Sequence, residues 1–115
     1  MIVDLSKVRI FVRAEPTDMR KQINGLSVLV QEEMNLDVFG TSIFLFCNKP
    51  RNRLKVLYWD KNGFAMWFKR LERDKFPWPK NIKEVREISQ EEIKLLLSGI
   101  DFWNAHKQLE YEKVC

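Results

Sequence analysis

The chain has 115 residues, of which 45% are hydrophobic and 31% are charged, and its formal net charge at pH 7 is +4. This length allows one domain with a single core and excludes two, and the apolar content excludes a disordered chain. A net charge of this size is ordinary for a soluble domain, so only local clustering of charge can point to a polyanionic partner. We predict a single domain over residues 1–115, with a core at about 7–102 and a helical tail at 103–115.

The ends and the cysteines predict a cytoplasmic protein. Met1 to Asp4 lack the basic start and apolar run of a signal peptide, and no apolar stretch approaches the roughly 20 residues of a membrane helix. Cys47 and Cys115 lie far apart in the sequence, and neither has a CxxC partner or a nearby histidine. This pattern is typical of reduced thiols in a cytoplasmic protein. We therefore expect no membrane contact, no metal and no cofactor.

The first third of the chain predicts a strand followed by a helix. Residues 7–13 alternate apolar with basic or aromatic side chains, the pattern of a half-buried strand. Thr17 or Asp18 can cap a helix that we expect over 18–34, where apolar residues recur at helical spacing. Gly25 lies inside that helix and indicates close packing there, such as a sheet crossing beneath it.

The middle of the chain predicts a central strand and a hairpin. Residues 42–47 are apolar on both faces, as in a strand that is covered on both sides. Arg53 to Trp59 and Phe64 to Leu71 are rich in aromatic and branched residues and flank the turn sequence DKNG. We expect a type I turn in which Gly63 takes the positive φ and closes the hairpin with a bulge.

The last third predicts an extended segment, a short strand and helices. Two prolines in 76–79 exclude a central strand, so Trp78 is expected to be held by packing rather than by pairing. A strand at 85–89 leads into a capping box, SQEE, and a helix that ends near Gly99. A terminal helix is expected over 101–113. The fold class is therefore α+β, with an antiparallel sheet of about four or five strands, a central hairpin, and helices packed on one face.

The stretch from Lys49 to Lys75 concentrates positive charge. It has nine Lys and Arg residues against three Asp and Glu, and each strand of its hairpin has one face that mixes basic and aromatic groups. Such a surface can contact phosphates and stack on bases, although tryptophans are more often core residues and strand cations often only face solvent. The candidate nucleic-acid-binding residues here are Arg51, Arg53, Lys55, Trp67, Lys69, Arg70, Arg73, Lys75 and Trp78.

Arg20 and Lys21 add two further candidates. They fall in the predicted first turn of a helix, where the positive end of the helix dipole disfavours cations. A partner would offset that cost. It can be a phosphate, or equally an acidic side chain such as Glu15 or Asp18.

Catalysis has little support in the sequence. His106 is the only histidine, and no nucleophile is placed convincingly beside it. The sequence has no glycine-rich phosphate loop, zinc spacing or nucleotide fingerprint. We predict a protein that is not an enzyme. The weakest alternative is a metal-dependent nuclease that uses scattered acids, namely Asp18, Asp60, Glu72, Asp74 and Asp101.

Several motifs in order carry a family resemblance over roughly 7–102. The chain resembles the TnpB-type accessory proteins, the second open reading frame products, of the bacterial insertion-sequence family sixty-six. The motifs are TDMRK at 17–21, GL at 25–26, LYWD at 57–60 with Gly63, KRLE at 69–72, FPWP at 76–79, and LL at 96–97 with GID at 99–101. The family's GIDW ending reads GIDFW here, and the tail after Trp103 runs beyond the usual end.

The resemblance implies a small protein of a mobile element, encoded beside a separate DDE-type transposase and needed for efficient transposition, with no established catalytic role. Our first hypothesis is a non-catalytic accessory factor for transposition, a form of DNA recombination, that binds DNA through the basic hairpin. The alternative is a protein-interaction module that docks the transposase without contacting DNA, because Trp59, Trp67, Trp78 and Trp103 are not assignable to one core. Neither hypothesis includes a small-molecule substrate.

Overall fold

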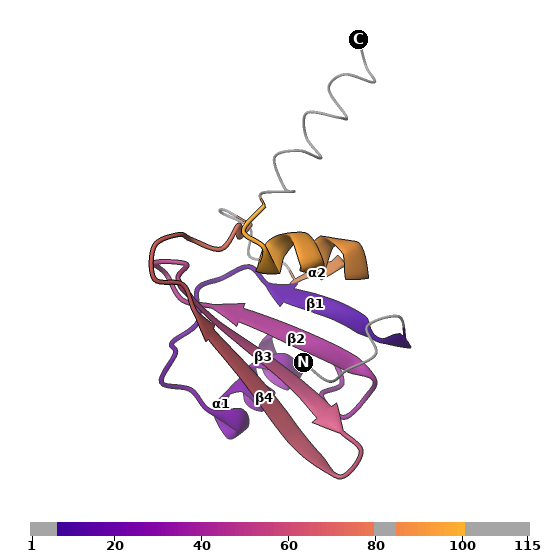
Figure 1. The fold of residues 1–115 in the computed structure, drawn as a ribbon. Coiled ribbons are helices and arrows are strands. Elements are labelled where there is room, and N and C mark those ends of the chain that lie inside the picture. Colours follow the sequence, from indigo (N-terminus) through magenta and orange to yellow (C-terminus); the bar gives the residue numbers. More distant parts are fainter. Residues whose placement is uncertain (1–6, 80–84, 101–115) are drawn as a thin grey trace.

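Five strands form one sheet in the computed structural model, which describes residues 7–79 and 85–100 (Figure 1). The strand order is β4-β3-β2-β1-β5, and β2 is the central strand, as predicted. The elements in chain order are β1 (Arg9–Arg13), α1 (Ile23–Val28), the π-helical segment η2 (Leu29–Glu33), β2 (Ser42–Cys47), β3 (Arg53–Asp60), β4 (Gly63–Arg70), β5 (Val85–Ile88) and α2 (Gln90–Leu97).

The α+β class is confirmed, but the expectation of a purely antiparallel sheet is wrong, because β1 and β2 run parallel. Ile10 lies beside Ile43 and Val12 beside Leu45, whereas the other neighbouring strands are antiparallel. Parallel neighbours need a long crossover, and α1 with η2 supplies it. The carboxyl ends of β1 and β2 consequently lie at the same end of the sheet.

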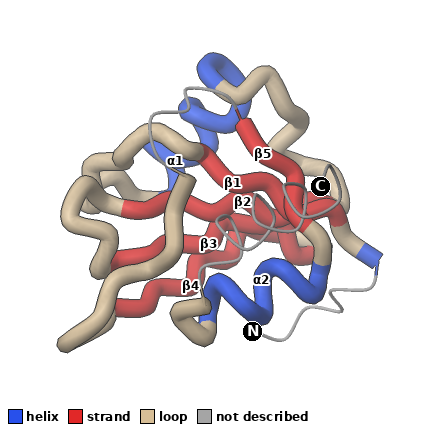
Figure 2. The backbone as a smooth tube through the Cα atoms, turned by 90° about the horizontal axis from the view of Figure 1, so that it is seen from above, coloured by secondary structure: helices blue, strands red, loops and turns tan. Residues whose placement is uncertain are grey.

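Helices cover both faces of the sheet, so the expectation that they pack on one face is also wrong (Figure 2). Leu26 and Val30 of the α1–η2 segment pack with Phe44, whereas Ile93 of α2 packs with Ile43. Both faces of β2 are apolar, and each face needs its own cover to exclude water.

The first helix begins later than predicted. It starts at Ile23 and makes no side-chain cap, because Thr17 and Asp18 are engaged elsewhere: the Thr17 hydroxyl accepts from Arg13 at 3.0 Å, and the Asp18 carboxylate accepts from the Arg20 amide at 2.9 Å. Gly25 does allow a close approach, but by the stem of the Lys21 side chain rather than by the sheet. A Cβ at Gly25 would lie 3.3 Å from the Lys21 Cβ and Cγ atoms.

The predicted hairpin is confirmed, with a tighter turn than expected. Asp60 pairs directly with Gly63, so only two residues form the loop, and the positive φ belongs to Lys61 (54°) rather than to Gly63. The mixed face of β3 is not open either, because Lys55 and Leu57 are buried. Only the two ends of β3 are therefore available at the surface.

The carboxyl-terminal part matches the local signals. Ser89 and Glu92 form the capping box of α2, and Gly99 has a positive φ of 83° just beyond its end. Trp78 is buried by packing, as expected. No helix in the described ranges is long and apolar enough to cross a membrane. The predicted terminal helix at 101–113, with His106 and Trp103, lies outside the described residues.

Candidate nucleic-acid interface

Three basic segments meet at the end of the sheet where β1 and β2 finish (Figure 1). The β2–β3 loop lies there, and so does the open end of the hairpin, where Arg53 pairs with Arg70. The chain leaving β4 returns across this end, since the Phe76 amide donates to the Arg51 carbonyl at 2.7 Å. We call this surface the basic end and define it by Arg20, Lys49, Arg51, Arg53, Arg70, Arg73 and Lys75.

Hydrogen bonds hold the β2–β3 loop in one conformation. The Asn48 side-chain oxygen accepts from the backbone amides of Asn52 and Arg53, each at 3.0 Å. Arg51 adopts a left-handed φ of 64°, and its amide donates to the Asn48 carbonyl at 3.1 Å. A non-glycine residue in this conformation needs support from its surroundings, which these bonds provide. The hydrogen-bonded loop therefore holds the backbone of Arg51 in a fixed position.

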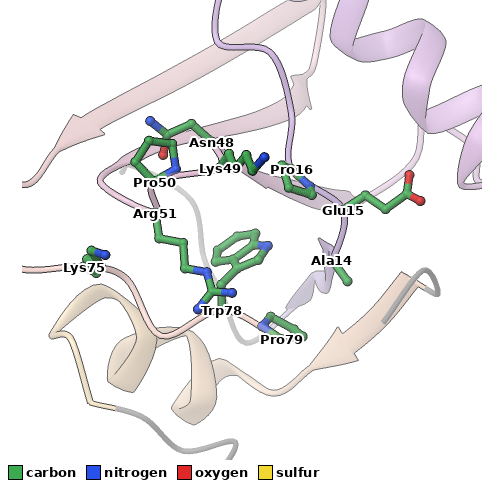
Figure 3. A pocket seen from close by; sticks show the side chains of 10 residues that line it. All are labelled: Ala14, Glu15, Pro16, Asn48, Lys49, Pro50, Arg51, Lys75, Trp78 and Pro79. Atoms are coloured by element: carbon green, nitrogen blue, oxygen red, sulfur yellow. The ribbon is translucent and has the colours of Figure 1, made fainter. Parts of the chain in front are cut away.

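A pocket of about 700 Å³ opens beside this loop, at the carboxyl ends of the parallel strands (Figure 3). In open sheets with parallel strands, this is the usual place for a ligand. Its lining combines proline and tryptophan surfaces with cations, and consists of Ala14, Glu15, Pro16, Asn48, Lys49, Pro50, Arg51, Lys75, Trp78 and Pro79. Figure 3 shows the Arg51 side chain reaching toward Trp78 and Pro79, while the Glu15 carboxylate points away from Arg51.

Most cations of the basic end lack an acidic partner. Arg20 pairs with Asp18 at 2.7 Å, and Arg70 pairs with Glu72 at 2.9 Å. The hydrogen bonds from Arg20 lower the pKa of the Asp18 carboxyl to about 2. Within the described ranges, no ion pair involves the remaining five cations, which are Lys49, Arg51, Arg53, Arg73 and Lys75. Their charge is available to an anion from outside.

Lys55 is not available for phosphate contact, contrary to the sequence hypothesis. Its residue is only 5% exposed, and its ammonium donates to the carbonyls of Met19 and Lys21, each at 2.8 Å, and to the Gln22 side chain at 3.5 Å. Burial lowers the pKa of Lys55, and the charge of Asp18 partly opposes that shift. Lys55 therefore fixes the turn before α1.

That turn also changes the interpretation of Arg20 and Lys21. Both are exposed, but they precede α1 instead of occupying its first turn, so the helix-dipole argument does not apply to them. Arg20 has the acidic partner considered as the alternative, Asp18. It lines a shallow hollow together with Arg53 and so joins the basic end.

The aromatic candidates pack rather than project. Trp78 is 5% exposed and its indole N–H donates to the Arg13 carbonyl at 2.9 Å. Trp67 is half-buried and packs against the core on the α2 face. Lys69 makes a long contact of 3.5 Å with the Leu97 carbonyl on that face. Neither tryptophan offers a free stacking surface, and only Trp78 contributes to the pocket lining.

Most residues of the basic end were predicted from the sequence, but Lys49 was not. Its signal was its place in the polar turn NKPRN, between a buried strand and the hairpin. Only the tertiary structure shows that Lys49 and Lys75, which the hairpin separates in the sequence, line the same pocket.

Two further observations concern the reactive groups of the described residues. Burial raises the pKa of the Cys47 thiol to about 12, so it stays protonated at neutral pH. Across the described residues, no group of three or more His, Cys, Asp or Glu side chains is placed to hold a metal ion.

Comparisons with known proteins place the chain in a family. It is 37% identical over 95 residues to a protein of Sinorhizobium fredii named uncharacterized protein y4jC, covering 83% of this chain and 81% of the relative. A second protein of that organism, uncharacterized protein y4hO, is 33% identical over 102 residues, covering 89% of each chain. No solved structure matches. The family model described as IS66 Orf2 like protein matches residues 8–107. The resemblance seen in the motifs is thereby confirmed, and the chain belongs to the IS66 Orf2-like family of transposition-associated accessory proteins.

Proposed function

We propose that this protein is a non-catalytic accessory factor for transposition that binds the phosphate backbone of DNA through its basic end. The observation that carries the proposal is the convergence of five cations without acidic partners in the described residues, from two loops and a strand end. Cations that neutralise phosphates release condensed counterions, which drives binding.

The fixed conformation of the β2–β3 loop favours specific binding of a phosphate group over a loose association with mobile counterions. Arg51 and Arg53 carry planar guanidinium groups that can bind two phosphate oxygens at once. The Asn48 hydrogen bonds hold the backbone of this loop before any ligand arrives. Less ordering entropy is then lost on binding.

The two ends of the hairpin allow a matched test. Arg53 and Lys61 are both exposed, and eight residue steps of extended chain separate them by roughly 25 Å. That distance exceeds the screening length of about 8–10 Å in ordinary salt. Arg53→Glu and Lys61→Glu make the same change in net charge, at opposite ends of one element.

Binding is measured with a labelled duplex carrying the element's terminal repeat and with a scrambled duplex, at two salt concentrations. We expect Arg53→Glu to weaken binding to both duplexes about tenfold and to flatten the salt slope by about 1. Lys61→Glu should bind nearly as the unmodified protein does. Equal effects of the two substitutions, or binding that ignores salt, would contradict the proposal.

A second candidate function is docking of the element's transposase. It is favoured by an aromatic end at the tip of the hairpin, which we define by Phe39, Trp59 and Phe64. Their rings lie 5.0–5.5 Å apart, and Phe39 is 54% exposed. Exposed aromatic side chains are typical of protein interfaces. Copurification with the transposase that survives nuclease digestion would support docking, and loss of the complex on digestion would count against it.

A further inference from the structure

The β4 strand forms an edge of the sheet, and its pairing with β3 determines which of its backbone groups face outward. Arg53 lies opposite Arg70, and the Leu71 amide continues this register by donating to the Asn52 carbonyl at 2.8 Å. Residues opposite each other alternate between hydrogen-bonded and non-hydrogen-bonded pairs in an antiparallel ladder. The odd-numbered residues of β4 therefore bond to β3, and the N–H and C=O groups of Phe64, Met66, Phe68 and Arg70 point away from it.

The β4 edge lacks most of the features that prevent an edge strand from pairing with a strand of another chain. Its eight residues pair with β3 without interruption, so it contains no bulge, and it contains no proline. Phe68 is 49% exposed, and the only cations are at the last two positions. The opposite edge, β5, has only four residues. A long, regular edge with an exposed aromatic side chain is a template for another strand.

We propose that β4 pairs with β4 of a second copy of this chain, antiparallel about a twofold axis perpendicular to the sheet. Such an axis keeps equivalent faces on the same side, so residues that meet must both be even-numbered or both odd-numbered. Centring the axis on Met66 places each exposed Phe68 opposite Phe64 of the other copy. It also places Arg70 opposite Asn62 and Lys69 opposite Gly63.

The distribution of charge along β4 favours a second copy of this chain as the partner strand at this edge. Both cations of β4 lie at one end, and an antiparallel partner brings them against the uncharged end of the same sequence. Like charges therefore do not face each other in the pairing from 62 to 70, and two aromatic pairs form across the new ladder. A parallel copy would instead align the cations with each other.

This pairing has a consequence for DNA that rests on the proposed function. The two basic ends would point in opposite directions along the joined sheet, because each lies where its own β4 ends. One dimer would then hold two separate DNA segments, as a protein that brings two element ends together must do.

The dimer is tested on the full chain without DNA, by size-exclusion chromatography with light scattering over a range of concentrations. The unmodified protein should have the mass of two chains. Phe68→Pro removes an outward N–H and the exposed ring without losing a bond to β3, and should give a folded monomer. Phe68→Tyr keeps both the donor and the ring, and should remain dimeric. A monomeric unmodified protein, which would leave the edge to a different chain, or a dimeric Phe68→Pro protein would overturn the proposal.

If Phe68→Pro does not fold, a disulfide cross-link tests the β4–β4 pairing instead. Met66→Cys in a Cys115→Ser background places two thiols opposite each other at the axis, with Cα atoms about 5.5 Å apart, which a disulfide can span. Oxidation should cross-link the chains, and a failure to cross-link would contradict the pairing. Binding of monomeric Phe68→Pro to a short duplex tests the basic end separately, because that surface is complete in one copy.

Discussion

The two ends of the hairpin differ in chemical character, basic at the open end and aromatic at the turn. At the basic end Arg53 pairs with Arg70, and at the aromatic end Trp59 pairs with Phe64. A hairpin brings its first residue against its last, so groups far apart in sequence gather at the open end and groups near the turn gather at the tip. Arg53 and Arg70 are thus separated from Trp59 and Phe64 along the strands rather than by the two faces of the sheet.

The pairing at the open end of the hairpin also creates an unfavourable contact. Arg53 and Arg70 are cations directly opposite each other, which costs stability in an antiparallel pair. Glu72 offsets part of it through Arg70, at 2.9 Å. A bound phosphate would offset the rest, and this agrees with the proposed role of the basic end.

The largest effect is expected from two residues of β3 that lie on the same face, Lys55 and Arg53. Lys55→Met should lower the free energy of unfolding by about 2–3 kcal/mol, because it leaves the part-buried carbonyls of Met19 and Lys21 without their charged donor. Arg53→Met removes an exposed side chain together with its repulsion of Arg70, and should change the free energy of unfolding by less than about 0.5 kcal/mol in either direction. Urea denaturation measures both.

The affinity for DNA should fall more in Arg53→Met than in Lys55→Met, the opposite order to the loss of stability. Arg53→Met loses a phosphate contact, whereas folded Lys55→Met should bind with nearly unchanged affinity. If Lys55→Met were as stable as the unmodified protein but bound DNA poorly, Lys55 would belong to the interface after all.

A smaller effect is expected at the aromatic end. Phe39→Ser removes a half-exposed ring and should cost about 1 kcal/mol of unfolding free energy. Its affinity for DNA should not change, because the basic end lies at the other end of the strands. If the aromatic end docks the transposase, copurification should fall in this variant and not in Arg53→Glu. The reverse pattern would assign docking to the basic end.

The smallest effect concerns Asp18 and Arg20. The pKa of the Asp18 carboxyl is about 2, below its ordinary 3.8, because the charged form accepts hydrogen bonds from Arg20. The lowered pKa means that the pair stabilises the fold above about pH 4 and that this contribution is lost as the pH falls toward 2. Since both groups are exposed, the change in stability should be slight.

Carboxyl NMR titration measures this directly. Arg20→Gln should move the pKa of Asp18 back toward 3.8. In DNA binding, Arg20→Gln should have a weaker effect than Arg53→Gln, because Arg20 must first leave Asp18. A stronger effect of Arg20→Gln would mean that the ion pair opens readily in the complex.

Features that depend on neighbours in the chain could be predicted from the sequence. Alternation and turn residues predicted the hairpin, an apolar run predicted the central position of β2, and the SQEE motif predicted the cap of α2. The motif order also identified the family. The structural signals are each read within a few residues, where covalent geometry limits the alternatives, whereas the family is identified by motifs spread along the chain.

Which surfaces face water depends instead on the tertiary packing. The crossover through α1 makes β1 and β2 parallel, covers the second face of the sheet and buries Lys55, and none of this follows from local pattern. The same topology brings Lys49, from before β3, to the same end as Lys75, from after β4. Long-range packing sets these outcomes, because burial depends on what lies across the space from a residue rather than on its neighbours in sequence.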